Sequence, residues 1–192
     1  MSYHGYCGRC CRKVDANDGQ LFNYISQGRN LSYKFVASMK RQRFEIGYGQ
    51  RKLHLVVDLQ HVLLDSRDDG VLVKLRPFAR EFLREANELF TIYAYTKSEP
   101  KQARNFIKLL DPLNIFFPSR FITRADEKKK KKSLEFVLAE ERGVVILDCN
   151  PETWDKDGKK NLLLIKSYDC LKEKEYQGPM ITKFINFLNH PR

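Results

Sequence analysis

A short apolar run that ends on a carboxylate is the feature that most constrains this chain. Residues 53–57 read LHLVV, rich in branched apolar side chains, and Asp58 follows at once. Such runs form strands buried on both faces of a parallel sheet. An acid at the carboxyl end of such a strand lies where open α/β sheets bind their ligands. We therefore predict an α/β fold with Asp58 at its functional edge, although a lone Asp there can simply begin a turn.

Two later apolar runs repeat this pattern. Residues 89–95 lead to Thr96, and residues 143–148 end on Asp148. A Thr in this place is often only a helix N-cap, and the following residues 97–100, KSEP, are typical of a helix start. Parallel strands bring their carboxyl ends to one edge of a sheet. We therefore expect three adjacent strands that gather Asp58, Thr96 and Asp148 at that edge.

A helix is predicted between the first two of these strands, with Pro77 in its first turn. Its core-facing stripe would be formed by the apolar residues that keep helical spacing: Phe78, Phe82, Leu83, Ala86 and Leu89. A tight turn is predicted at 68–70 and a closing amphipathic helix at 181–188.

The residues around these strand ends resemble the C-terminal-domain phosphatases of RNA polymerase II, in the haloacid dehalogenase superfamily. Residues 58–62, DLQHV, are similar to their DxDxT signature, and residues 74–96 match nearly position for position. The resemblance covers about residues 51–170 and more weakly 1–50. It is further carried by these segments: KLLDP (108–112), KKSLEFVL (131–138), Trp154 and NLLLI (161–165). It implies a Rossmann-like haloacid-dehalogenase fold, a central parallel sheet flanked by helices.

The resemblance also implies roles for single residues. Asp58 would be the nucleophile that forms an aspartyl-phosphate, and Thr96 would donate to a phosphoryl oxygen. Lys132, approaching the same edge from a helix after the Lys run, would neutralise the charge that a transferring phosphoryl group spreads over its oxygens. Mg²⁺ would be held by Asp58, the main-chain carbonyl of residue 60 and the residues at 148 and 149. The substrate would be phosphoserine in the tail of RNA polymerase II.

Two departures from the family pattern affect these roles. The second Asp of the signature, the general acid/base, is Gln60 here, and Gln cannot exchange a proton at neutral pH. General acid/base catalysis contributes about 10²–10⁴-fold in rate. Where the family has a second metal ligand, Cys149 offers a soft sulfur, whereas Mg²⁺ prefers hard oxygen. We therefore expect Mg²⁺ to bind weakly beside Asp58 and Asp148.

Three functions remain open from the sequence. The first is a phosphoserine phosphatase whose turnover is strongly weakened. The second is a pseudophosphatase that binds phosphorylated tails as a competitor or scaffold, and the third, weaker option is hydrolysis of small phosphate esters. Larger members of the family carry a BRCT domain after the catalytic one, and we expect none in this chain.

The first 50 residues are predicted to be a basic N-terminal segment before a phosphatase-like domain at 51–192. Residues 1–52 hold ten Lys or Arg and three Asp or Glu, a net charge of +7 out of +11 for the chain. Cys7 and Cys10 form a CxxC, as in plant members of the family. A Zn²⁺ site there is left open but not favoured, because no second ligand pair follows. Residues 31–44 are predicted to form a basic amphipathic helix.

Composition bounds the location and partners of the chain. No apolar run approaches the length of a membrane span, and the five Cys are an odd number that fits a reducing compartment. Five consecutive Lys at 128–132 are usually a solvated stretch but also suit a nuclear import signal, so we expect the nucleus. Direct nucleic-acid binding is not favoured, because no recognisable nucleic-acid module is present.

Overall fold

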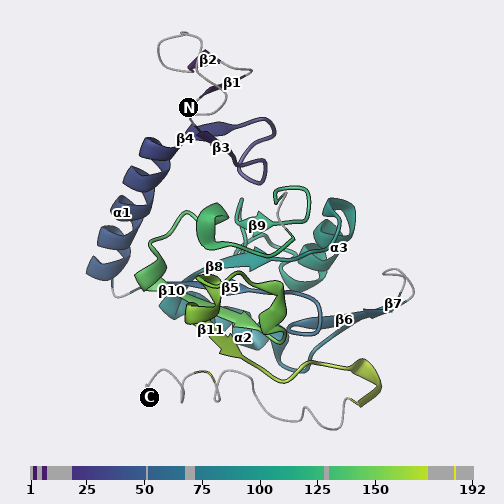
Figure 1. The fold of residues 1–192 in the computed structure, drawn as a ribbon. Helices are drawn as coiled ribbons and strands as arrows, with labels where there is room; N and C mark the ends of the chain where they lie inside the picture. The colour runs from purple at the N-terminus through teal and green to yellow at the C-terminus, as the bar shows by residue number, and fades with distance from the viewer. Residues whose placement is uncertain are drawn as a thin grey trace.

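A five-stranded parallel sheet forms the centre of the molecule. The computed structural model describes residues 2–3, 6–7, 19–50, 52–67, 72–127, 130–172 and 184. The strand order is β11-β10-β5-β8-β9 (Figure 1). The strands are β5 (Leu53–Val57), β8 (Phe90–Tyr95), β9 (Phe121–Ile122), β10 (Val144–Asp148) and β11 (Leu162–Leu164). The three strands predicted from apolar runs are therefore adjacent and parallel, as expected.

The central strand β5 is apolar because both of its faces are covered. Leu55 and Val57 face a cluster that includes the buried side chains of α2 (Ala79–Leu89) and α3 (Pro100–Leu110). Val56 faces the other way, into a cluster built from Tyr93, Tyr95, Trp154 and the segment at 134–139. Alternating side chains of one strand thus belong to two different cores, which fixes the strand register.

Helix α2 differs from the predicted pattern at both of its ends. Phe82, Leu83 and Ala86 are buried as predicted, but Phe78 and Leu89 are 45% and 43% exposed. Phe78 is the N-cap and adopts a left-handed φ of 63°. Pro77 therefore lies in the turn before the helix and not in its first turn. The turn aims Phe78 outward, so the apolar stripe is shorter than its spacing suggests.

The N-terminal segment packs against the sheet domain. Strands β1 (Ser2–Tyr3), β2 (Tyr6–Cys7), β3 (Gly19–Leu21) and β4 (Asn30–Ser32) form an antiparallel sheet in the order β2-β1-β4-β3. Helix α1 (Tyr33–Gly49) follows, capped by the Ser32 hydroxyl, and it extends beyond the predicted 31–44. The guanidinium carbon of Arg142 lies 4.1 Å from the ring centroid of Phe44, which belongs to α1. The Tyr24 hydroxyl donates to the carbonyl of Phe136 at 2.8 Å.

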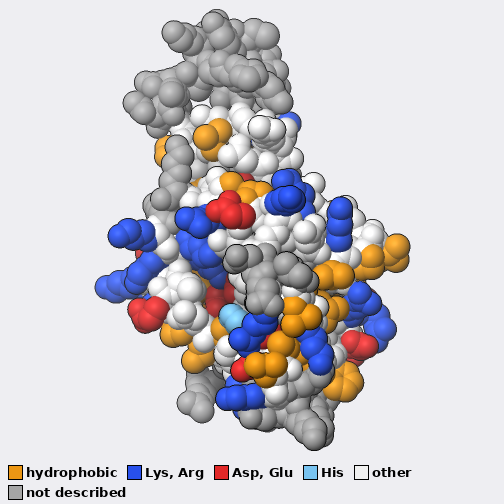
Figure 2. Space-filling model, turned by 90° about the vertical axis from the view of Figure 1, so that its right-hand side faces the viewer, with side chains coloured by type: hydrophobic (Ala, Val, Ile, Leu, Met, Phe, Trp, Pro, Cys, Tyr) orange, Lys and Arg blue, Asp and Glu red, His pale blue; other side chains and the backbone are white. Residues whose placement is uncertain are grey.

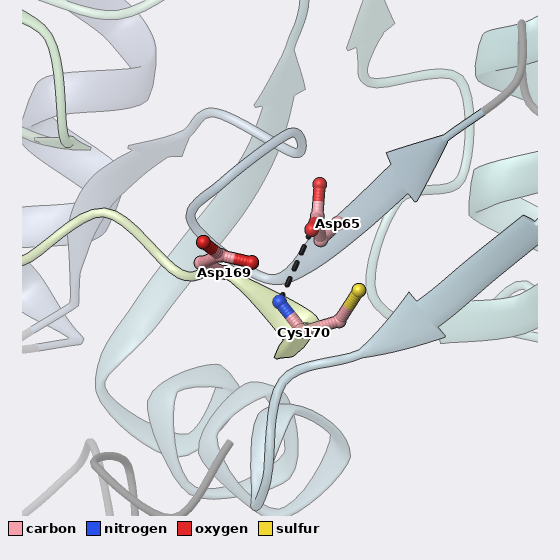
Figure 3. A group of neighbouring side chains, drawn as sticks. All are labelled: Asp65, Asp169 and Cys170. Carbon is pink, nitrogen blue, oxygen red and sulfur yellow. Dashed lines mark hydrogen bonds between the residues drawn. The ribbon is translucent and has the colours of Figure 1, made fainter. Parts of the chain in front are cut away.

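A hairpin follows the Asp58 loop and is hydrogen-bonded to residues 169 and 170. The hairpin is β6 (Leu64–Arg67) with β7 (Leu72–Leu75). Asp65 accepts hydrogen bonds from the Arg67 side chain at 3.0 Å and the Cys170 main-chain N–H at 3.1 Å. Arg67 also donates to Asp169 at 2.8 Å. Figure 3 shows Asp65, Asp169 and Cys170 drawn together, and the Arg67 guanidinium accounts for this grouping without a bound cation.

Some predicted features lie outside the described residues. These are the Cys10 half of the CxxC, with nothing described of the Cys7 side chain, the turn at 68–70 and Lys128 with Lys129. Of the closing helix predicted at 181–188, only Phe184 is described, and its ring packs near those of Phe82 and Phe90. Within the described part of the chain, none of the helices is long and apolar enough to cross a membrane.

Candidate active site

The carboxyl ends of three adjacent strands deliver the predicted residues to one edge of the sheet. Asp58 follows β5, and its main-chain N–H donates to the Leu147 carbonyl of β10 at 3.0 Å. Thr96 follows β8 and Asp148 ends β10. Because β5 lies between β8 and β10 in the sheet, its Asp58 is the middle member of this group. This arrangement matches the expectation drawn from the three apolar runs.

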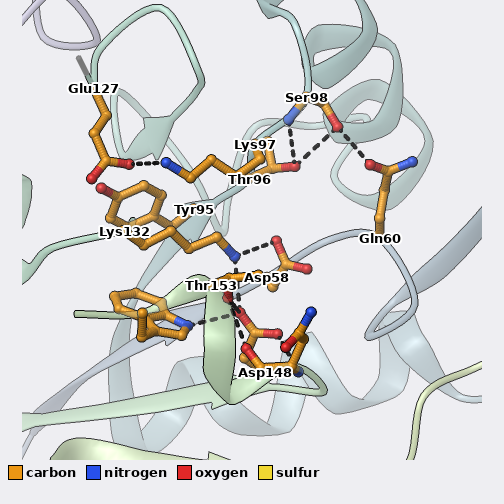
Figure 4. Close-up of polar contacts among 12 residues, drawn as sticks. Asp58, Gln60, Tyr95, Thr96, Lys97, Ser98, Glu127, Lys132, Asp148 and Thr153 are labelled. Atoms are coloured by element: carbon orange, nitrogen blue, oxygen red, sulfur yellow. Dashed lines mark hydrogen bonds and ion pairs between the residues drawn. The ribbon is translucent and has the colours of Figure 1, made fainter. Parts of the chain in front are cut away.

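Lys132 joins two of these residues. It is 1% exposed, and its Nζ donates to Asp58 Oδ1 at 2.8 Å and to Asp148 Oδ2 at 2.9 Å (Figure 4). The ammonium also lies 5.3 Å from the Trp154 ring centroid and 5.8 Å from that of Tyr95. One side chain of the Lys run thus points inward while Lys130 and Lys131 stay exposed.

The route by which Lys132 reaches the site differs from the predicted helix. Its main chain pairs with the segment before Trp154: the Lys132 N–H donates to the Thr153 carbonyl at 2.7 Å, and the Asp155 N–H donates to the Lys132 carbonyl at 3.1 Å. The element directly after Lys132 is a single 3₁₀ turn, Leu134–Phe136, and not an α-helix. An extended bridge to the loop after β10 therefore positions this lysine.

The charges of the site are coupled. Burial raises the pKa of Asp58 to about 6, Lys132 opposes this rise, and the nearby charge of Asp148 adds to it. Burial alone would lower the pKa of Lys132, but the two carboxylates outweigh it and the pKa is raised. Lys132 is therefore a fixed cation between two acids, and the carboxylate of Asp58 gains a proton on mild acidification.

Asp148 and Cys149 have different surroundings. Besides Lys132, Asp148 accepts from the Trp154 indole N–H at 2.8 Å and from the Asn150 main-chain N–H at 2.9 Å. Burial, followed by the charge of Asp148, raises the pKa of the Cys149 thiol. Residue 149 therefore presents a neutral S–H at physiological pH, which is a poor ligand for a hard cation.

Gln60 is held by two serines that the sequence did not single out. Its Nε2 donates to Ser66 Oγ at 2.8 Å, and its Oε1 accepts from Ser98 Oγ at 3.0 Å. Ser98 is buried and in turn accepts from the Thr96 hydroxyl at 3.0 Å. In Figure 4 the amide of Gln60 points to Ser98 and not to Asp58. The position of Ser98, two residues after Thr96, was the only sequence signal for it.

The structure therefore brings the predicted residues into one region, with direct contacts inside two groups. Asp58, Lys132 and Asp148 form the first group, and Gln60, Thr96 and Ser98 form the second. Their catalytic and metal-binding roles remain predictions.

A family model for NLI interacting factor-like phosphatases matches residues 53–190, which is most of the chain. The chain belongs to the NLI interacting factor-like phosphatase family. It is 33% identical over 202 residues to "RNA polymerase II C-terminal domain phosphatase-like 4" of Arabidopsis thaliana, covering 87% of this chain and 46% of that protein. It is 26% identical over 196 residues to an RNA polymerase II C-terminal domain phosphatase of Encephalitozoon cuniculi, covering 92% of this chain and 47% of that one.

Solved structures agree on the fold of this family member. Fission yeast Fcp1, described as an RNA polymerase II CTD phosphatase bound to beryllium fluoride, superposes with a TM-score of 0.61 at 20% identity, over 68% of this chain and 46% of that one. A second structure, "The Structure of Fcp1, an essential RNA polymerase II CTD phosphatase", gives 0.62 at 18% identity, over 80% and 55%. This confirms the predicted α/β fold. The chain spans about half the length of the curated relatives it matches.

Proposed function

We propose that this chain is a phosphoserine-directed phosphatase domain of the RNA polymerase II C-terminal-domain type, with turnover strongly weakened at Gln60. One observation carries the proposal: Lys132, deeply buried, joins the carboxylate of Asp58 to that of Asp148 at the carboxyl edge of the sheet. Burying a cation between two acids costs desolvation free energy. This cost is offset only when all three charged groups remain paired. Such an arrangement is suited to holding a phosphoryl group against a carboxylate.

The chemistry would proceed through Asp58. A carboxylate oxygen of Asp58 attacks phosphorus, and the bond between phosphorus and the serine oxygen breaks, so the serine oxygen leaves with the electron pair and needs a proton. Lys132 and the Thr96 hydroxyl would offset the charge on the phosphoryl oxygens. In the second step, water attacks the phosphorus of the aspartyl-phosphate, releases phosphate and returns the carboxylate of Asp58. That water must lose a proton, and the amide of Gln60 cannot take it.

The residues present fit Mg²⁺ with one donor missing. The hard oxygens are the carboxylates of Asp58 and Asp148 and the main-chain carbonyl of Gln60, whereas residue 149 supplies a protonated thiol. A bound Mg²⁺ would offset phosphoryl charge as a Lewis acid. The tail of RNA polymerase II is proposed as the substrate because the relatives are named for it. A nuclear location is proposed because that substrate is nuclear.

The second candidate is a pseudophosphatase that binds phosphorylated tails without hydrolysing them. The observation that favours it is the double tether of Gln60 to Ser66 and Ser98. The tether engages both ends of the amide within the protein and turns it away from Asp58, where a leaving group would lie (Figure 4). In this case Asp58, Lys132 and Thr96 would serve only as a binding site for a phosphoserine.

The two candidates predict different time courses with an aryl phosphate. Phenolate is a stable leaving group, so the first step hardly needs a proton donor, and the weakened enzyme should release a burst of phenol equal to the enzyme concentration. It should then nearly stop, with phosphate left on Asp58. Stopped-flow absorbance and intact mass spectrometry measure both quantities. A complete absence of burst and of the phosphate adduct, with phosphopeptide binding retained, would favour the pseudophosphatase. Asp58→Asn should abolish the burst and serves as the blank.

Replacing the thiol should strengthen Mg²⁺ binding. Cys149→Asp restores a hard oxygen ligand, and calorimetric titration should show affinity higher by about tenfold, equal to about 1.4 kcal/mol. Cys149→Ser removes the sulfur without adding a carboxylate and is expected to change the affinity little. An identical titration for Cys149→Asp and the native protein would show that residue 149 is not a ligand.

The Lys run is expected to direct nuclear import. Changing residues 128–131 to Ala, while keeping Lys132, should move a fusion with a bulky fluorescent protein toward the cytoplasm. Lys130 and Lys131 are exposed, so the change should leave folding intact. A fusion that stays in the nucleus would leave the run as a solvated stretch.

Direct nucleic-acid binding is not proposed. Figure 2 shows basic side chains spread among acidic and hydrophobic ones on one face and not gathered in a continuous stripe.

A further inference from the structure

A cavity lies at the end of the sheet opposite to Asp58. It has a volume of about 290 Å³ and is lined by α1, the amino ends of β5 and β8, and the loop before β9. His54, at the start of β5, lines it. At about 3.3 Å per strand residue, His54 is roughly 13 Å from Asp58 along the strand. This cavity is therefore separate from the candidate active site.

The charged side chains that line the cavity are all basic. Arg43 of α1, Lys52 and Arg120 face it, and none of its lining residues is Asp or Glu. Among the described residues, none of these three cations forms an ion pair. Three positive charges without ion-pair partners repel one another; burial, together with the charge of Arg43, lowers the pKa of Arg120, and the charge of Asp111 opposes this only in part. An anion in the cavity would relieve this repulsion.

The two guanidinium groups are held in place by neutral partners. Arg43 donates to the Tyr93 hydroxyl at 2.8 Å, and Arg120 donates to the carbonyls of Ile92 at 3.0 Å and Phe116 at 3.1 Å. A guanidinium carries five N–H donors in a fixed plane. Each of the two therefore keeps N–H groups for a ligand while its orientation is already set, which reduces the entropy lost on binding.

His54 provides the independent sign of a ligand. It is 5% exposed, yet neither ring nitrogen has a hydrogen-bond partner. Its ring contacts the edge of Tyr93 at a centroid distance of 6.1 Å. Burial, followed by the charges of Arg43 and Arg120, lowers the pKa of His54 to about 4, so the ring is neutral at physiological pH. A neutral imidazole keeps one N–H donor, and a buried donor without a partner calls for a ligand or an ordered water.

We propose that this cavity, through Arg43, Lys52, Arg120 and the His54 ring, binds a phosphate-class oxyanion at a site distinct from the active site. Arginine forks match phosphate oxygens in pairs, and lysine adds a point charge. The volume is at the lower limit of known ligand pockets and suits one phosphoryl group with few atoms attached. The group can belong to free inorganic phosphate or to a phosphorylated side chain of a protein.

Nuclear magnetic resonance can follow the two phosphate sites separately. The His54 ring reports on the cavity, and the Trp154 indole N–H, bonded to Asp148, reports on the active site. The probe is inorganic phosphate, titrated into the full chain against chloride at equal ionic strength. The His54 signal, assigned by its loss in His54→Gln, should shift to saturation with phosphate and not with chloride. Its midpoint should differ from that of the Trp154 signal.

Charge removal should separate specific binding from screening. Arg43→Gln should weaken phosphate binding at His54 about tenfold, as expected for the loss of a charge-assisted bond. Lys52→Gln, whose side chain has no ion pair in the described structure, should weaken it about threefold without risk to folding. The matched control is Arg41→Gln on the outer face of α1, where the guanidinium pairs with Glu45 and should not affect the midpoint.

A second titration decides which kind of molecule carries the phosphoryl group. In it, a phosphoserine peptide is added to the Asp58→Asn variant. A tighter midpoint at His54 for the peptide than for phosphate assigns a phosphorylated protein, and a weaker midpoint assigns free phosphate. The proposal is overturned if the His54 signal responds equally to chloride and phosphate, or if Arg43→Gln and Lys52→Gln both leave its midpoint where Arg41→Gln does.

Discussion

Gln60→Asp is expected to convert a stalled protein into one with steady phosphoserine turnover. A carboxyl group at residue 60 can protonate the leaving serine oxygen and then accept a proton from the attacking water. General acid/base catalysis of this kind contributes about 10²–10⁴-fold, equal to about 3–5 kcal/mol of barrier. Phosphate release from a phosphoserine peptide under multiple-turnover conditions measures the gain. Cys149→Asp should add to it by restoring the missing hard ligand.

Two matched variants test why Asp should succeed. Gln60→Asn has the length of Asp without an ionisable proton and should stay inactive. Gln60→Glu is ionisable but has the length of Gln, so the tether to Ser66 and Ser98 should hold it away and limit the gain. If the native chain already turns over phosphoserine steadily and Gln60→Asp gains little, another group supplies the proton. His61, whose Nδ1 lies 3.2 Å from the Tyr168 carbonyl, is then the first residue to replace.

Lys132→Met is expected to produce the largest loss of stability. It fills similar space but removes the cation that two buried carboxylates share. Removing one partner of a buried ion pair typically costs about 3–5 kcal/mol. Urea unfolding at neutral pH should show a loss of this order, and phosphoryl transfer to Asp58 should also disappear. Lys131→Met, at an exposed neighbouring position, should leave the unfolding midpoint unchanged.

The stability deficit of Lys132→Met should depend on pH. Burial already raises the pKa of Asp58 to about 6, and the loss of Lys132 would raise it further. A carboxyl whose pKa is higher in the folded than in the unfolded chain favours folding when it is protonated. The deficit should therefore be greatest at neutral pH, shrink as the pH falls toward 6, and level off at lower pH, where Asp58 is protonated in both folded proteins. A deficit that is the same at pH 7 and pH 5 would show that electrostatics does not cause it.

The sequence was sufficient to predict the sheet and the edge at which Asp58, Thr96 and Asp148 gather. Three apolar runs of strand length, each leading to Asp58, Thr96 or Asp148, allow few arrangements other than parallel neighbours with these residues at one edge. The inward turn of Lys132 was predicted from the family resemblance. It could not be derived from the residues themselves, because five adjacent lysines are equivalent until a tertiary contact selects one.

Other features depended on contacts between distant segments and could not be predicted. The tether of Gln60 requires Ser66 and Ser98, which lie 6 and 38 residues away from it. The left-handed turn at Phe78 exposes a side chain whose spacing suggested burial. The His54 cavity requires α1 to approach the start of β5, which no local pattern records. The strands could thus be predicted from local runs of apolar residues. The contacts at their ends could not, because they depend on segments that are distant in the sequence.

The place of β5 in the middle of the sheet has a consequence for the timing of folding during synthesis. Asp58 lies in the first third of the chain, but its partner Lys132 follows 74 residues later, and β10 later still. At about 5–20 residues per second, the ribosome would need roughly 4–15 seconds to deliver Lys132 after Asp58. During this interval the nascent β5 has hydrophobic faces and a missing neighbour. The edge that carries Asp58, Lys132 and Asp148 is therefore among the last parts of the sheet to form, and chaperone capture of the unfinished chain should be most frequent before residue 148 leaves the ribosome.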